Sequence, residues 1–267
     1  MRRGILILAA IGMSCASARR GGELQLEKLP IAGVELQLRY NTGVAADARK
    51  IASLVGPSLE EVSKAWGALE APLTIEVLAD HAALEEAAEK SGHAWLRAWA
   101  RYDVVFIQAP STWGLFAGED SAVREMLIHE LTHAVMYQRA ASASDWQWRG
   151  FPLWFREGMA STTARQEYRR GSVEDLAVFL RANPGSDPIR IPEAIYQTQS
   201  LMVYTAAHHA FVNLQSRFGE ESVRALLRHM HDHGASFSRA FVAVMKMNQE
   251  DFEAEFLRFV RSQDKAN

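Results

Sequence analysis

The chain has only one cysteine, Cys15, among its 267 residues, which excludes an internal disulfide framework. No charge of one sign dominates, because 29 Lys and Arg residues stand against 32 Asp and Glu residues, for a formal net charge of −3. The basic residues are also scattered, so the chain lacks the electrostatic footprint of a nucleic-acid-binding protein. Internal repeats and low-complexity segments are absent, and the apolar fraction of 48% is that of a globular protein.

The chain also has little at its N-terminus that could span a membrane. The apolar run from Ile5 to Met13 is too short for a stable bilayer anchor, which predicts no span in the mature chain. Arg2 and Arg3 precede this run, and small residues follow it up to Ala18. That order is typical of a secretory signal peptide over residues 1–18 and predicts export to the periplasm or beyond the cell.

Two other interpretations of this leader stay open. One is lipidation at Cys15, although the residues just before this cysteine match a lipoprotein signal poorly. The other is a short N-terminal core helix. Cleavage after Ala18 would leave the mature chain without a thiol, which would also exclude a cysteine nucleophile or metal ligand.

Hydrophobic periodicity predicts strands in the first part of the chain and helices in the rest. Alternating apolar and polar residues predict strands over 33–40, 73–78 and 103–108. Helical patterns predict a helix over 45–69 that is broken at Gly56-Pro57, and a short helix over 81–90. Further helices are predicted over 121–139, 153–170, 173–182, 199–217, 220–233 and 248–263. Strands followed by helices indicate an α+β protein.

The segment Leu127 to Ala134 contains the pattern His-Glu-x-x-His. On a helix, His129 and His133 lie one turn, or about 5.4 Å, apart on the same face, so both imidazoles can bind one metal ion. Glu130 then lies beside the metal, where it can accept a proton from a water molecule. A surface helix with two solvated histidines is the alternative. The apolar residues around the motif argue against it, because they predict burial, and buried polar groups need partners.

A zinc site with an open coordination position needs a third protein ligand. Glu157 follows His133 by 24 residues, within the segment Pro152 to Ser161, and has apolar neighbours on both sides. An ordinary solvated helix glutamate is the alternative. The His-Glu-x-x-His motif upstream favours Glu157 as the ligand.

Together, His-Glu-Leu-Thr-His and Pro-x-Trp-Phe-x-Glu-Gly-x-Ala resemble the motifs of the gluzincin metallopeptidases, specifically the bacterial peptidase MA-like group, over roughly residues 100–262. The resemblance implies one Zn²⁺ per chain, with His129, His133 and Glu157 as its ligands and Glu130 as the general base. It implies a peptide or protein substrate, whose peptide bonds are hydrolysed by a zinc-bound water molecule.

The same resemblance implies a zincin-like fold, in which a small mixed sheet packs on the active-site helix and a helical C-terminal lobe follows. Residues 19–267 would form a single domain, with an N-terminal α/β lobe at about 30–140 and a helical lobe at about 150–264. The strand over 103–108 would be the edge strand against which an extended peptide pairs.

The resemblance also implies residues that assist the metal site without binding the metal. By the same resemblance, a tyrosine or histidine of the C-terminal lobe stabilises the oxyanion, and Tyr204 is the first candidate, before His208 and Tyr196. Ser161 is the candidate for orienting a zinc-binding histidine.

The aromatic cluster Trp146 to Phe155 could line a specificity pocket, although helix packing is the favoured interpretation. The His229 to His233 run is interpreted as solvated, because helix positions two apart do not face each other.

Three functions compete on these observations. The first is an exported zinc metallopeptidase. The second is a zinc-bearing binding or scaffold protein of the same fold without relevant turnover. The third is a metal-independent helical protein.

Overall fold

The computed structural model describes residues 22–31, 33–114 and 118–264. The predicted signal peptide and Cys15 lie outside these residues. Within them, no helix combines the length and the apolar character needed to cross a membrane.

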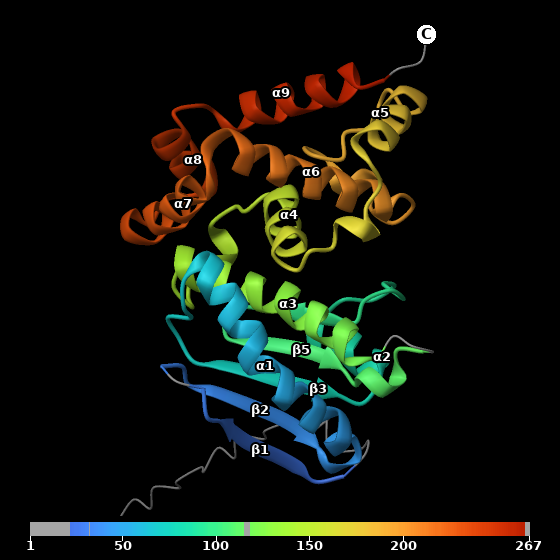
Figure 1. The fold of residues 1–267 in the computed structure, drawn as a ribbon, viewed down its shortest axis with the longest axis vertical. Helices are drawn as coiled ribbons and strands as arrows, with labels where there is room; N and C mark the ends of the chain where they lie inside the picture. Colours follow the sequence, from blue (N-terminus) through green and yellow to red (C-terminus); the bar gives the residue numbers. More distant parts are fainter. Residues whose placement is uncertain (1–21, 32, 115–117, 265–267) are drawn as a thin grey trace, which may run out of the picture.

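A five-stranded mixed sheet, in the order β1-β2-β3-β5-β4, forms the base of the molecule (Figure 1). The three central strands β2 (Leu36–Asn41), β3 (Leu73–Leu78) and β5 (Val104–Gln108) are parallel. The outer strands β1 (Leu24–Leu29) and β4 (Ala98–Ala100) pair antiparallel to their neighbours. The α+β prediction with a small mixed sheet is therefore confirmed.

The prediction that the strand over 103–108 forms the sheet edge is wrong. β5 has β3 on one side and β4 on the other, so β4 is the outer strand at this end of the described sheet. Sequence periodicity missed β4 because three residues, Ala98 to Ala100, are too few to show alternation. It also missed β1, whose Leu24 and Leu26 are exposed and whose one buried residue is Leu29.

The two faces of the sheet are covered by different helices. Ile75, Val105 and Ile107 belong to the main core, shared with α1 (Ala45–Trp66) and α3 (Asp120–Ala140). Figure 1 shows these two helices on the same side of the sheet. Phe106, one residue out of phase, packs instead with Leu84 of α2 (His81–Ala88). The strand period of two thus directs alternate residues of β5 into two separate cores.

The predicted break at Gly56-Pro57 is also wrong, because α1 runs continuously through Pro57. Ile51, Val55 and Leu59 form a buried stripe that crosses this position, while Pro57 faces solvent. Burial of the stripe outweighs the loss of one backbone hydrogen bond at the proline.

The C-terminal part of the chain is helical and lies beyond α3 in Figure 1, with α4 between the two parts. Its helices are α4 (Leu153–Thr163), α5 (Val173–Ala182), α6 (Ser200–Phe218), α7 (Glu220–His233), α8 (Phe237–Met245) and α9 (Gln249–Ser262). Sequence periodicity did not predict α8. It also placed the end of α4 at Arg170, whereas the helix ends at Thr163 and Arg165 takes up a left-handed conformation with φ 54°.

Packing of α4 on α6 fixes the position of α4. A Cβ atom added at Gly158 would lie 2.3 Å from the Ala207 carbonyl oxygen and 2.5 Å from the Phe211 Cβ, so the two helices touch backbone to backbone here. Phe155, fully buried, meets the Phe211 ring edge to face at 5.5 Å. The favoured interpretation of the aromatic cluster as helix packing holds for Trp154 and Phe155, which are fully buried.

Candidate metal centre

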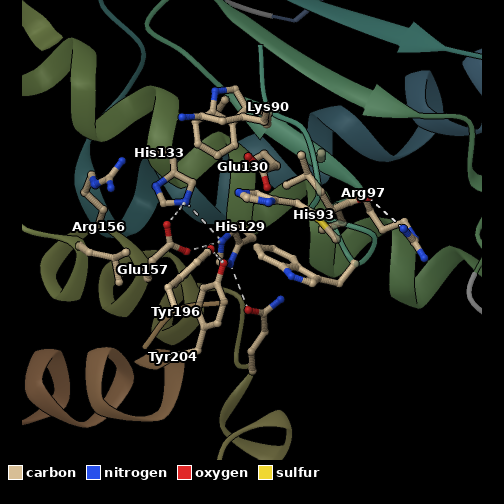
Figure 2. Close-up of a pocket in the computed structure, with 18 of the residues that line it drawn as sticks. Lys90, His93, Arg97, His129, Glu130, His133, Arg156, Glu157, Tyr196 and Tyr204 are labelled. Atoms are coloured by element: carbon tan, nitrogen blue, oxygen red, sulfur yellow. Dashed lines mark hydrogen bonds and ion pairs between the residues drawn. The ribbon is translucent and has the colours of Figure 1, made fainter. Parts of the chain in front are cut away.

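Three side chains from two helices converge on one point (Figure 2). His129 and His133 project from one face of α3, and their Nε2 atoms lie 3.3 Å apart. Glu157 of α4 places Oε2 at 3.4 Å from His129 Nε2 and Oε1 at 3.7 Å from His133 Nε2. Both histidines are buried, as the apolar flanks of their motif indicate.

The spacing of these atoms fits a tetrahedral zinc ion. Bonds of about 2.0–2.1 Å at tetrahedral angles hold two ligand atoms roughly 3.3–3.4 Å apart. His129 Nε2 lies 3.3 Å from His133 Nε2 and 3.4 Å from Glu157 Oε2, which matches that requirement, and the 3.7 Å separation from His133 Nε2 is to the other Glu157 oxygen. Two imidazole nitrogens and one carboxylate oxygen are also donors that zinc accepts, and three protein ligands leave one position open.

Burial and neighbouring charges favour the metal-binding protonation states of His133 and Glu157, while Glu157 and Glu130 raise the pKa of His129. Burial lowers the pKa of His133 to about 3, so this imidazole is neutral at physiological pH. Burial alone would raise the pKa of Glu157, but His133, His129 and Arg156 together lower it to about 2. A neutral imidazole and an ionised carboxylate are the states in which these groups bind metal.

Glu130 lies next to the three ligands without being one of them. Burial raises the pKa of its carboxyl to about 7, and the charge of Glu157 acts in the same direction. Its carboxylate also accepts a hydrogen bond from the backbone N–H of Ala100 in β4. A carboxylate with a pKa near neutrality can both accept and return a proton, as a general base requires.

Gln166, a residue that the sequence did not indicate, orients His129. Its Oε1 lies 3.0 Å from His129 Nδ1, and its Nε2 donates to Glu125 Oε1 at 2.9 Å. Arg170 Nη2 donates to the same Gln166 oxygen at 3.1 Å. A proton on Nδ1 leaves Nε2 free to face the metal.

The prediction that Ser161 orients a zinc-binding histidine is wrong. Ser161 Oγ lies 3.0 Å from Nδ1 of His208 and donates to the Gly158 carbonyl at 3.2 Å. Ser161 therefore faces α6, whereas His129 and His133 lie on α3. The same contact removes His208 from the candidates for an oxyanion donor, because its ring is directed to Ser161 and does not line the cavity described below.

Tyr196 and Tyr204 do face the metal ligands (Figure 2). Their hydroxyl oxygens lie 2.7 Å apart. Burial raises the pKa of Tyr196 to about 12 and that of Tyr204 well above its ordinary value. Both hydroxyls are therefore protonated at neutral pH and can donate hydrogen bonds.

A cavity of about 460 Å³ opens onto this group. Its walls are the segment from Lys90 to Ala100, helices α3 and α4, and the tyrosines Tyr196 and Tyr204. Trp95, which is 44% exposed, meets the rings of Tyr196 and Tyr204 edge to face at 5.7 and 5.9 Å. The strand β4 lies along the cavity, so its unpaired side borders the candidate metal centre.

The His229 to His233 run forms no comparable group in the described part of the chain. His229 and His233 stack at 4.1 Å, and His231 lies 3.2 Å from the exposed Asp232 carboxylate. This agrees with the prediction of solvated histidines at a helix end.

No family model matches the chain, and no curated protein matches it. Solved structures similar to it include an M1 zinc metallopeptidase from Deinococcus radiodurans, at 12% identity and a TM-score of 0.47, covering 92% of this chain and 53% of that one. A two-domain M1 zinc metallopeptidase variant bound to L-arginine matches at 14% identity and a TM-score of 0.46, covering 90% and 51%.

An aminopeptidase N family protein from Idiomarina loihiensis matches at 12% identity and a TM-score of 0.47, covering 92% and 48%. The chain thus spans about half the length of these proteins.

Proposed function

We propose that this chain is a zinc-dependent metallopeptidase that cleaves peptide bonds with a water molecule activated by Glu130. His129, His133 and Glu157 would hold one zinc ion per chain. The observation that carries the proposal is the convergence of His129, His133 and Glu157, whose ring nitrogens and carboxylate oxygens lie 3.3–3.7 Å apart, with a second carboxyl group, that of Glu130, beside them but outside the ligand set.

A bound zinc ion supplies a Lewis acid that polarises a carbonyl and lowers the pKa of a water molecule towards about 7. Glu130 then accepts a proton from the attacking water, because its own pKa of about 7 matches that task. It returns this proton to the leaving amine. Gln166 keeps His129 in the tautomer that binds metal.

The position of the outer strand β4 favours a peptide as the substrate. An extended peptide can pair with the unpaired side of β4, which borders the cavity beside Glu130. This assignment replaces the role that the sequence gave to the strand over 103–108.

Tyr204 is the proposed donor to the oxyanion. Its hydroxyl is protonated at neutral pH and lies in the cavity with the metal ligands. In this role the Tyr196 hydroxyl donates to the Tyr204 oxygen across their 2.7 Å contact, which leaves the Tyr204 proton for the oxyanion. We also propose export of the protein, on the sequence pattern of residues 1–18 alone.

The test compares wild type with Glu130→Gln on a mixed peptide library, with zinc content measured on both. Glu130→Gln should retain zinc and lose hydrolysis by at least about 100-fold. Glu193→Gln is the matched control, since Glu193 is an exposed carboxylate at the rim of the same cavity. Zinc binding without hydrolysis by any of these proteins would favour the binding or scaffold function. Absence of zinc would favour the metal-independent alternative.

A further inference from the structure

Arg156 is a cation inside the cavity that lacks a carboxylate partner. It belongs to α4, directly before Glu157, and is half-buried. Within the described residues, Arg156 makes one long hydrogen bond of 3.4 Å from Nη1 to the Tyr137 hydroxyl, and its buried Nε has no partner. By contrast, the more deeply buried Arg149 pairs with Asp145 at 2.6 Å. A half-buried guanidinium without an ion pair keeps most of its N–H donors for a ligand.

The other cations of the cavity have partners within the protein. Arg169 pairs with Glu125 at 2.9 Å, and Arg170 donates to Gln166 and lies over the Tyr204 ring at 5.1 Å. Arg97 donates to the backbone carbonyls of Ala94 and Leu96. Lys90 lies over the Trp99 ring at 5.1 Å. Among the arginines that line the cavity, Arg156 therefore has the weakest contacts with other described residues.

The position of Arg156 relates it to the metal centre. Figure 2 shows it beside His133 and Glu157, on the other side of these ligands from His93 and Arg97. Tyr137, which receives its hydrogen bond, lies nearly parallel to the His133 ring at 6.3 Å. A group bound by Arg156 and Tyr137 would thus lie next to the His133 side of the site.

We propose that Arg156 and the Tyr137 hydroxyl bind a carboxylate of the peptide substrate next to the scissile bond. This inference rests on the proposed function and gives it a substrate class. A planar guanidinium matches a carboxylate through two parallel N–H donors, and the tyrosine hydroxyl adds a third. An ammonium group would be repelled at the same place. The carboxylate is either the C-terminal α-carboxylate or an Asp or Glu side chain, and both present the same chemistry.

Four peptides distinguish these sources. Two have a free C-terminal carboxylate and two a C-terminal amide, and in each pair the residue next to the cleaved bond is Glu in one peptide and Gln in the other. A C-terminal carboxylate predicts that amidation lowers kcat/KM by about 10- to 100-fold, as loss of a charge-assisted hydrogen bond does. A side-chain carboxylate predicts the same loss for Glu replaced by Gln in the amidated peptides. Equal kcat/KM for all four peptides would overturn the inference and leave the proposed peptidase function standing.

Variants locate the effect at Arg156. Arg156→Gln should abolish the preference for the carboxylate, whereas Arg156→Lys should keep part of that preference. Lys90→Gln removes a cation at the cavity rim and should preserve the preference. A loss in Lys90→Gln equal to that in Arg156→Gln would show general electrostatic attraction and contradict a dedicated site.

Binding separates this inference from the peptidase function. Fluorescence anisotropy of the same labelled peptides on zinc-loaded Glu130→Gln needs no turnover. The carboxylate peptide should bind about 10- to 100-fold more tightly than the neutral one, and the added Arg156→Gln substitution should remove that difference. Tight binding of carboxylate peptides by a wild-type protein that cleaves nothing would overturn the peptidase function and support the carboxylate site. Equal binding of acid and neutral peptides would overturn the site alone.

Discussion

The Nδ1 atom of His129 lies 3.0 Å from the Oε1 atom of Gln166, and this contact joins α3 to the turn that follows α4. The oxygen of Gln166 accepts the Nδ1 proton, which directs Nε2 of His129 towards His133 and Glu157. Glu125 holds the amide end of Gln166 at 2.9 Å. Glu125 thus holds Gln166, and Gln166 fixes the orientation of His129, a candidate metal ligand.

Gln166→Leu should weaken zinc binding by about 10- to 100-fold, because loss of a partner behind a metal-binding histidine typically has that effect. Competition with a chromogenic chelator measures the affinity. Gln197→Leu is the matched control, since Gln197 is exposed at the cavity rim. Equal zinc affinity in Gln166→Leu and wild type would show that Gln166 does not position His129.

Tyr204→Phe should lower kcat by about 100- to 1,000-fold, because it removes a preorganised donor to the developing oxyanion. Zinc content and KM should change little. Tyr196→Phe should lower kcat less, since Tyr196 acts through its 2.7 Å contact with Tyr204. Steady-state kinetics on one peptide compares all three proteins. A larger effect of Tyr196→Phe than of Tyr204→Phe would assign the donor to Tyr196.

Gly158→Ala should destabilise the fold by about 1–3 kcal/mol, because its Cβ would overlap the Ala207 carbonyl and the Phe211 side chain. The displaced α4 also carries Glu157, so zinc affinity should fall with stability. Gly56→Ala in α1 is the matched control. It meets no atom within 4 Å and should stabilise by up to about 1 kcal/mol through helix propensity. Urea unfolding of both variants checks the opposite signs.

The lowered pKa of His208 predicts that the free energy of unfolding depends on pH. Burial, with the charges of His209 and Arg170, lowers its pKa to about 4, whereas the unfolded chain has its ordinary value of 6.5. Between these values the unfolded state binds a proton that the folded state does not, so stability falls as the pH drops from about 6.5 to 4. The loss is about 1.4 kcal/mol per pKa unit at most.

The His208→Gln variant lacks this titration and should lose less stability over the same range. Urea unfolding of wild type and variant at several pH values between 7 and 4 gives the difference. The wild-type stability should decline more steeply than that of the variant. Parallel curves would mean that His208 has a similar pKa in the folded and unfolded states.

Local sequence patterns predicted the parts of the molecule that depend on local periodicity. The helix spacing of His129 and His133 places both imidazoles on one face of α3, and the structure brings Glu157 to them from the second motif. The strand over 73–78 is confirmed residue for residue as β3. Such features follow from repeats of two or 3.6 residues that a sequence shows directly.

The features that sequence patterns missed depend on how distant segments meet. Gln166 reaches His129 only because α4 ends at Thr163 and Arg165 reverses the chain in a left-handed conformation. Ser161 has the expected spacing from Glu157, but packing of α4 on α6 directs it to His208. The edge position of β4 is a property of strand order, which three residues cannot encode locally.

The proposed peptidase function depends most directly on which residues hold the metal. Zinc content per chain, measured by mass spectrometry on purified wild type and single variants, tests this point. We expect about one zinc in wild type and in Glu130→Gln, and loss of zinc in folded His129→Ala, His133→Ala and Glu157→Ala, because each of these removes one of three protein ligands. Full zinc content in the three ligand variants, or its loss in Glu130→Gln alone, would contradict the account.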